Sequence, residues 1–173
     1  MGAEVTTPRA GESGVSLIET LAATALILIA IAGLGSMGVV GMTTTENEGH
    51  LAARCTEYAQ DKMEQLLVLA WADTDSDTRV FPAPGIGGTG LAVGGSAVST
   101  APVNGYVDYL DQSGNLLPSG AGVPAAWFYV RVWSVTNPSV NLKQVTVTAT
   151  VSSTLGRNRP PSSTVTSLKT FPF

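Results

Sequence analysis

Two hydrophobic patterns follow one another in the first half of the chain, and the first is an uncharged run. From Leu21 to Met42 nearly every side chain is apolar or small, and no Asp, Glu, Lys or Arg lies between Glu19 and Glu46. At ~1.5 Å per residue, a helix over this run is long enough to cross a hydrocarbon core of ~30 Å. The pattern therefore predicts a transmembrane helix with a single carboxylate, Glu19, near its start.

The second pattern is amphipathic, with apolar side chains at three- and four-residue spacing and polar side chains on the other side. No proline interrupts residues 15–81, so we expect one helix of about 55 residues that ends near Ala72. Its polar side carries Glu57, Gln60, Asp61, Glu64 and Gln65. Its apolar stripe, which we expect to lie against a sheet, consists of Leu51, Cys55, Tyr58, Ala59, Met63, Leu66, Leu67, Ala70 and Trp71.

Glycines interrupt the apolar run at Gly33, Gly35, Gly38 and Gly41. Each costs about 1 kcal/mol relative to alanine inside a helix. Small residues let neighbouring helices approach closely in membranes, but glycines also mark places where a helix loosens. A third interpretation is that the glycines are neutral in lipid, and the sequence leaves all three open.

The second half of the chain predicts a loop followed by β-structure. Residues 82–105 are rich in Gly, Pro and Ala and predict an irregular surface loop. Residues 106–110, a turn over 111–115 and Leu116-Leu117 then predict a hairpin.

Three longer strands are expected after this hairpin. Residues 126–136 are aromatic and β-branched, and Asn137-Pro138 is expected to end the first strand. Residues 142–152 alternate, and residues 163–171 form the last strand. The inward face of the middle strand is expected to carry Val145, Val147, Ala149 and Val151. The expected fold class is α+β, with an antiparallel meander on the C-terminal half of the helix.

The start of the chain carries a family signature. Gly14-Val15-Ser16-Leu17-Ile18-Glu19, followed by the apolar run, resembles the type III N-terminal signal of type IV prepilins and type II secretion pseudopilins. The resemblance implies that a prepilin peptidase cuts after Gly14 and that Val15 becomes an N-methylated N-terminus. It also implies that Glu19 pairs with the free amine of a neighbouring subunit. An amine and a carboxylate in apolar surroundings relieve each other's desolvation and fix the register between subunits.

The same resemblance implies a pilin-like architecture and life cycle. Residues 1–14 would be the leader, 15–72 the transmembrane and assembly helix, and 73–173 the globular β-rich domain. The chain would span the inner membrane once, N-terminus in the cytoplasm, and then move into a periplasmic or cell-surface pilus. Its partners would be other pilin subunits, the peptidase, the inner-membrane assembly platform and, before extraction, membrane lipid.

Three functions share this N-terminal signal. The aromatic strand with Arg131 and Trp133, followed by residues 142–148, is similar to minor pilins of the type IV pilus modification group. A structural minor pilin that enters or primes a type IV pilus is therefore expected. The alternatives are a pseudopilin of a type II secretion system and a tip pilin for adhesion or DNA uptake.

Two readings without a filament also explain the apolar run. A secretory signal peptide could be cut near Ala23-Thr24-Ala25, although this site lies in the middle of the run and the preceding segment is weakly basic. A plain single-span anchor explains the run but gives Glu19 no use.

The charge and the reactive side chains narrow the class of protein. Without residues 1–14 the chain of 173 residues keeps 8 basic and 11 acidic side chains, a balance that argues against bulk binding to nucleic acid. The sequence holds one histidine, His50, and one cysteine, Cys55. No catalytic pattern, zinc set or phosphate loop is recognisable, so we expect no enzyme activity, cofactor or metal. Cys55 is expected to be a buried small side chain, with an intermolecular or redox role as the alternative.

Two further segments allow alternative readings. Asp73, Asp75 and Asp77 have the spacing that opens a calcium loop, but Thr78 and Pro84 stand where that loop needs Gly and Glu, so a solvated acidic turn is expected. Trp127, Tyr129, Arg131 and Trp133 alternate, and if exposed this row would offer stacking and cation–π contacts to nucleic-acid bases. Arg157 and Arg159 are expected at a hairpin tip and could serve the same binding role. We expect this aromatic row to be buried core instead.

Overall fold

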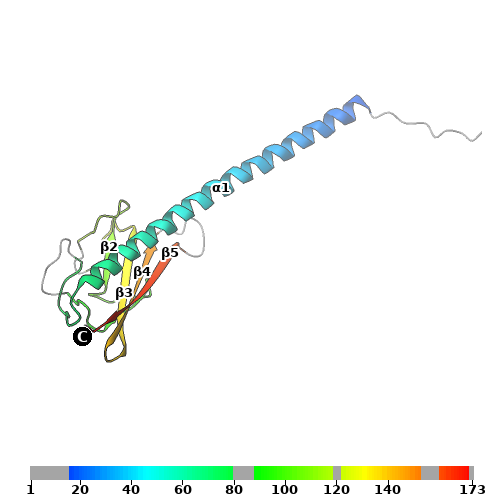
Figure 1. Ribbon diagram of the computed structural model, residues 1–173. Coiled ribbons are helices and arrows are strands. Elements are labelled where there is room, and N and C mark those ends of the chain that lie inside the picture. Colours follow the sequence, from blue (N-terminus) through cyan, green and yellow to red (C-terminus); the bar gives the residue numbers. More distant parts are fainter. Residues whose placement is uncertain (1–15, 80–87, 119–121, 153–159, 172–173) are drawn as a thin grey trace, which may run out of the picture. The chain divides into compact units, whose positions relative to one another are not determined.

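The computed structural model describes residues 16–79, 88–118, 122–152 and 160–171, and these include one long helix, α1, over Leu17–Val68. The chain divides into two compact units, residues 1–45 and 46–173, and α1 contributes to both. Figure 1 shows α1 as a continuous ribbon. The helix ends before the expected Ala72, because the amide of Leu69 bonds the carbonyl of Leu66 and the chain then enters a turn.

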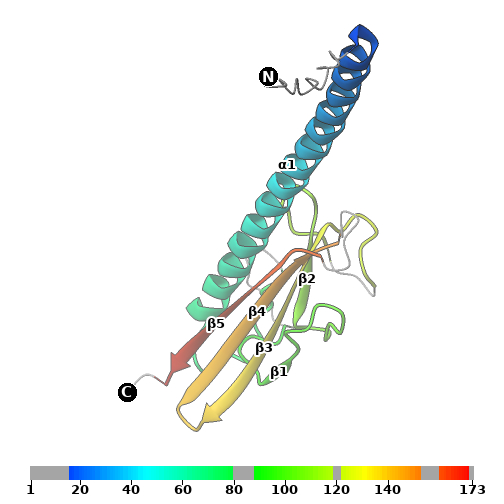
Figure 2. The same ribbon diagram turned by 90° about the vertical axis from the view of Figure 1, so that its right-hand side faces the viewer.

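The described residues of the second unit form one antiparallel sheet of five strands. The strands are β1 (Gly94–Gly95), β2 (Val107–Leu110), β3 (Tyr129–Ser139), β4 (Leu142–Val151) and β5 (Ser162–Thr170). The order is β1-β3-β4-β5, and β2 also pairs with β3. Figure 2 shows the β3-β4-β5 meander beside the C-terminal half of α1. The expected α+β arrangement of a long N-terminal helix and an antiparallel sheet is confirmed.

The core lies where the amphipathic stripe of α1 meets the inward face of the sheet. Cys55, Tyr58, Met63 and Leu66 on α1 are buried against the valine face of β4, whose residues Val145, Val147, Ala149 and Val151 are all at most 1% exposed. Alternation along β4 puts Thr146 and its neighbours on the opposite face, as expected. The predicted contact between helix and sheet is therefore confirmed.

Two expectations about strand ends and loops differ from the structure. Asn137-Pro138 does not end β3, because the pair sits in an irregularity of the register between Thr136 and Ser139, where proline needs no ladder partner. Within residues 88–105, the segment expected to be a surface loop, Gly94 and Gly95 pair with β3 and Leu91 is fully buried. Residues 82–87 lie outside the described part of the chain.

Candidate functional site

The first unit presents an apolar helical surface that carries one carboxylate. Every described side chain from Leu17 to Thr43 is exposed, including that of Glu19. Leu17 and Ile29, for example, are 80% and 70% exposed. In the described part of the chain, α1 is the one helix long and apolar enough to cross a membrane. Such a surface requires lipid or other apolar helices around it.

The start of α1 positions Glu19 in its first turn. Ser16 precedes the helix, and its hydroxyl accepts a hydrogen bond from the amide of Glu19 at 3.4 Å. Ser and Glu at this spacing form the capping-box pattern. A carboxylate in the first turn also interacts favourably with the positive end of the helix dipole. Glu19 therefore has a local use in the helix in addition to the intersubunit pairing that the resemblance implies.

The other residues that the resemblance assigns cannot be placed. Gly14 and Val15 lie outside the described residues. Among the glycines of the apolar run, a Cβ built on Gly33, Gly35 or Gly38 meets nothing within 4 Å. The helix surface at these glycines is open in a single chain, which is compatible with all three interpretations given above.

Three residues of the aromatic row are buried, as expected, but Trp127 is only half-buried and does not share their face. Tyr129, Arg131 and Trp133 are 3%, 3% and 1% exposed and face α1. Trp127 precedes β3 and packs with Tyr109 in a second cluster. The buried rings of Tyr129 and Trp133 are not available to stack on bases. Arg157 and Arg159 lie outside the described residues.

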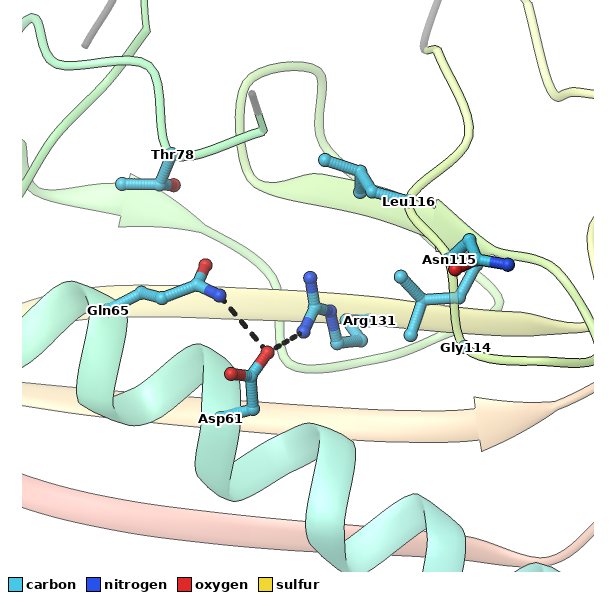
Figure 3. Close-up of a pocket in the computed structure, with 8 residues that line it drawn as sticks. Asp61, Gln65, Thr78, Gly114, Asn115, Leu116 and Arg131 are labelled. Atoms are coloured by element: carbon cyan, nitrogen blue, oxygen red, sulfur yellow. Dashed lines mark hydrogen bonds and ion pairs between the residues drawn. The ribbon is translucent and has the colours of Figure 1, made fainter. Parts of the chain in front are cut away.

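A buried ion cluster occupies the position where the aromatic row meets α1. Lys62 Nζ lies 2.7 Å from Asp108 Oδ2, and both side chains are at most 1% exposed. Arg131 donates from Nε and NH2 to the two oxygens of Asp108 at 2.7 and 2.9 Å. Its NH1 bonds Asp61 at 2.7 Å, a contact drawn in Figure 3. The cluster joins α1, β2 and β3 with two positive and two negative charges.

The two cations of this cluster stabilise the charged form of Asp108. Burial alone would raise the pKa of Asp108, but Lys62 and Arg131 outweigh it and hold the pKa below its usual range. Lys62 also donates to the carbonyl of Thr78 at 2.8 Å and lies 4.2 Å from the centre of the Trp133 ring. These contacts of the Lys62 ammonium group all lie within the fold.

The acidic turn after α1, the cysteine and the histidine are placed as follows. Asp73 accepts hydrogen bonds from the amide and hydroxyl of Ser76, and Asp77 pairs with Arg79 at 2.8 Å. No group of three His, Cys, Asp or Glu side chains that could hold a metal occurs among the described residues. Cys55 is fully buried, which confirms the expected small core side chain. His50 is exposed on α1.

No protein-family model matches this chain, and no curated protein or solved structure matches it.

Proposed function

We propose that this chain is a pilin-like subunit, most similar to a minor pilin, that is processed after Gly14, N-methylated at Val15 and assembled into a type IV pilus. In this proposal the chain is first held in the inner membrane by the apolar part of α1. The assembly platform then extracts it, and the helix exchanges lipid for the helices of other subunits.

The observation that carries the proposal is the combination of an exposed apolar helical surface with Glu19 at its start. A helix that only anchors a domain gains from this carboxylate no more than the capping of its first turn, whereas a carboxylate costs up to about 3 kcal/mol towards the bilayer centre. A helix that polymerises gains a specific partner for that charge, namely the amine of the next subunit. The exposure of every described side chain from Leu17 to Thr43 supports the proposal, because these side chains are available to other helices.

Mass spectrometry of the N-terminal peptide, from the full chain expressed in its own cell, tests the processing. The expected mature chain begins at N-methylated Val15. As a matched control, Gly14→Val should leave the leader attached, because a side chain at the cleavage point blocks the peptidase. An intact Met1 start in the unaltered chain, or a cut near Ala25, would refute the proposal.

A second measurement separates the pilus from the secretion system, which share the N-terminal signal. Deletion of the gene should abolish or reduce surface pili while secreted proteins remain at their normal level, and sheared pili should contain the mature chain. Loss of secretion with intact pili would instead assign the chain to the pseudopilins.

A further inference from the structure

Strand β5 forms one edge of the sheet, because β4 is its neighbour on one side and no strand of the described chain pairs with its other side (Figure 2). The strand is nine residues long, and its pairing with β4 runs from Ser162 to Thr170 without a bulge. None of these residues takes part in the proposed assembly through Glu19. The edge is therefore a second feature of the chain, separate from the assembly helix.

The register with β4 shows which backbone groups of β5 face outward. The amide of Phe171 donates to the carbonyl of Asn141 at 3.0 Å, and the amide of Val151 donates to that of Pro161 at 3.1 Å. Opposite residues of an antiparallel pair exchange hydrogen bonds at every second position, so the odd-numbered residues of β5 bond β4. The even-numbered residues turn their N–H and C=O groups away from β4, and all five are exposed: Ser162, Thr164, Thr166, Leu168 and Thr170. Among the contacts of the described residues, these ten groups have no hydrogen-bond partner.

The two edges of the sheet differ in their protection against pairing. Proteins protect exposed edges with short strands, bulges, proline or outward charges. The edge opposite β5 has such features, because β1 has two residues, β2 has four, and Pro138 lies in the irregularity of β3. β5 has none of them, and its one charged residue, Lys169, bonds the carbonyls of Leu67 and Leu69 on α1. The ladder of β5 is therefore open along its whole length.

The edge specifies the chemistry of what binds it. Five N–H donors and five C=O acceptors, repeated about every 6.8 Å, match the backbone of an extended chain. The exposed side chains beside them carry hydroxyl groups, apart from Leu168, which is 58% exposed, and none is charged. Such a row pairs with uncharged hydroxyl-bearing or β-branched side chains. We propose that β5 binds an extended, uncharged segment of a partner polypeptide, which adds antiparallel to it as a further strand of the sheet.

A second copy of this chain fits the edge less well, although β5 can pair with itself. Antiparallel self-pairing about Thr166 places every even-numbered residue opposite another one and satisfies all ten groups. However, β5 runs in the same direction as α1, since Cys55 contacts Pro161 at its start and Leu67 contacts Lys169 near its end. Self-pairing would set two α1 helices antiparallel, whereas chains that enter a membrane from the same side have parallel helices. The occupant is accordingly a segment of a different protein.

Hydrogen exchange of the backbone amides, measured by NMR on the full chain in detergent micelles, tests the proposal. The probe is the acetylated and amidated peptide Ser-Ser-Thr-Val-Thr-Ser-Leu-Thr-Thr, which has the sequence of β5 with threonine in place of the one lysine and is therefore uncharged. The amides of Thr164, Thr166 and Leu168 should exchange rapidly in the chain alone and at least tenfold more slowly with saturating peptide. The odd-numbered amides of β5, which bond β4, should exchange slowly in both states.

Two methylated forms of the peptide provide a matched control. N-methylation of its third, fifth and seventh residues removes the donors that face β5 in this register. N-methylation of its second, fourth and sixth residues removes as many donors from the far side. The first form should bind at least tenfold more weakly than the second, because several hydrogen bonds are lost together.

Two variants of the chain separate the backbone of β5 from its side chains. Thr166→Pro removes an outward N–H, so β4 loses no partner, and should weaken peptide binding at least tenfold. Thr166→Val keeps this N–H and the shape of the side chain, and should bind like the unaltered chain. Slow exchange of the odd-numbered amides verifies an intact sheet in each variant. If Thr166→Pro disturbs the sheet, the methylated peptides still decide the question on the unaltered chain.

Four results would overturn the proposal. The first is slow exchange of the even-numbered amides in the chain alone, and the second is no protection of them by the peptide. The third is equal binding of the two methylated peptides, or of Thr166→Pro with an intact sheet and Thr166→Val. The fourth is a dimer of the full chain, detected by sedimentation in micelles, that Thr166→Pro converts to a monomer, because it would assign the edge to a second copy.

Discussion

Lys143 and Lys169 lie directly opposite each other on β4 and β5, and both ammonium groups donate to main-chain carbonyls, Lys169 at the C-terminal end of α1 and Lys143 beyond it. Lys169 Nζ donates to the carbonyls of Leu67 and Leu69 at 2.6 and 2.7 Å. The last turn of α1 holds no basic residue of its own. The sheet therefore supplies the positive charge that the negative end of the helix dipole favours.

Lys143 completes this arrangement beyond the helix end. Its Nζ donates to the carbonyls of Trp71 and Leu91 at 2.7 and 2.9 Å and lies over the Trp71 ring at 5.0 Å. Two like charges on neighbouring strands repel each other, but here each faces main-chain oxygens that would otherwise be unsatisfied. The two lysines thus join β4 and β5 to the main chain at the end of α1 and just beyond it.

Lys169→Met should lower the free energy of unfolding by about 1–3 kcal/mol, because it leaves two helix-end carbonyls without a donor. The methionine keeps the length of the stem, so the loss reports the ammonium group. Chemical denaturation of the full chain in micelles, followed by tryptophan fluorescence, measures it. Arg54→Met is the matched control, since Arg54 forms an exposed pair with Glu57 worth at most about 1 kcal/mol. Equal effects of the two variants would contradict the capping role.

Asp108→Asn should be the most damaging change in the ion cluster, at about 3–5 kcal/mol, because it leaves Lys62 and Arg131 buried with less negative charge. Lys62→Met should cost less, since Arg131 still holds both oxygens of Asp108. Urea midpoints of the two variants at pH 7 test this ranking. The reverse order would show that Lys62, and not Asp108, is the centre of the cluster.

The same carboxylate predicts a pH dependence. Since Lys62 and Arg131 hold the pKa of Asp108 below its unfolded value of about 4, its stabilising effect is fully present above that pH and is lost as pH falls through the lower folded pKa. The difference in unfolding free energy between the unaltered chain and Asp108→Asn should therefore shrink below about pH 4. Asp75→Asn, a change at an exposed carboxylate, should stay within about 0.5 kcal/mol of the unaltered chain at pH 7. A constant difference for Asp108→Asn from pH 7 to pH 2 would contradict this account.

The long elements could be predicted because they depend on local periodicity. The three- and four-residue spacing in α1 and the two-residue alternation in β4 each recur several times, and every recurrence places an apolar side chain on the same buried face. The end of β3 could not be predicted from Asn137-Pro138, which is expected to end a strand when read in isolation. In the structure the pair lies in a bulge, and pairing with β4 resumes at Ser139. Trp127 does not share the face of Tyr129 and Trp133 that simple alternation predicts, because it lies before β3, where the strand has not yet begun.

The ion cluster was missed although part of its signal is local. Lys62 lies four residues after Tyr58 and four before Leu66, so it falls on the apolar stripe and not on the polar side of α1. This position indicates a buried cation that requires a partner. The identity of the partner is not local, because Asp108 and Arg131 come from β2 and β3 and meet Lys62 only after the sheet has formed.

Gly95→Ala should destabilise the sheet by about 1–3 kcal/mol. Gly95 has a φ of +81°, and a Cβ there would collide with the carbonyl of Trp133 and with the Tyr106 ring. Gly49→Ala is the control, because Gly49 lies within α1 and a Cβ there meets nothing within 4 Å. That substitution should be neutral or stabilise by up to about 1 kcal/mol. Thermal unfolding of both variants measures the contrast, and a neutral Gly95→Ala would contradict the close approach of β1 and β3.

Cys55 should resist alkylation in the native chain. Burial raises the pKa of its thiol to about 11, and Sγ lies 3.6 Å from the carbonyl of Pro161. The thiolate fraction at pH 8 is then roughly a hundredfold lower than that of an ordinary cysteine. Mass spectrometry after treatment with N-ethylmaleimide should show an unmodified native chain and complete labelling in denaturant. Ala53→Cys in a Cys55→Ala background places a thiol at an exposed helix position and should react rapidly. Native labelling at the same rate for both chains would contradict the burial.

Glu19→Ala should impair filament assembly while membrane insertion and processing after Gly14 stay intact. The proposed function gives Glu19 the role of partner to the N-terminal amine of the next subunit, and removal of one member of a buried pair costs about 3–5 kcal/mol. Glu19→Gln separates this role from the local one, because glutamine keeps the capping-box pattern with Ser16 but loses the charge. We therefore expect both variants to fail in assembly. The mature chain in sheared filaments and in membranes, measured by immunoblot, gives the fraction assembled.

Thr20→Ala is the control for this pair of variants. Thr20 is the next residue of α1, is equally exposed, and its hydroxyl bonds only the carbonyl of Leu17 in its own helix among the described contacts. It should assemble at the level of the unaltered chain. Normal assembly of Glu19→Gln with failure of Glu19→Ala would reduce the role of Glu19 to helix capping. Normal assembly of both variants would show that assembly does not need the charge of Glu19. The proposed function would then lose the pairing between this carboxylate and the amine of the next subunit, on which it depends.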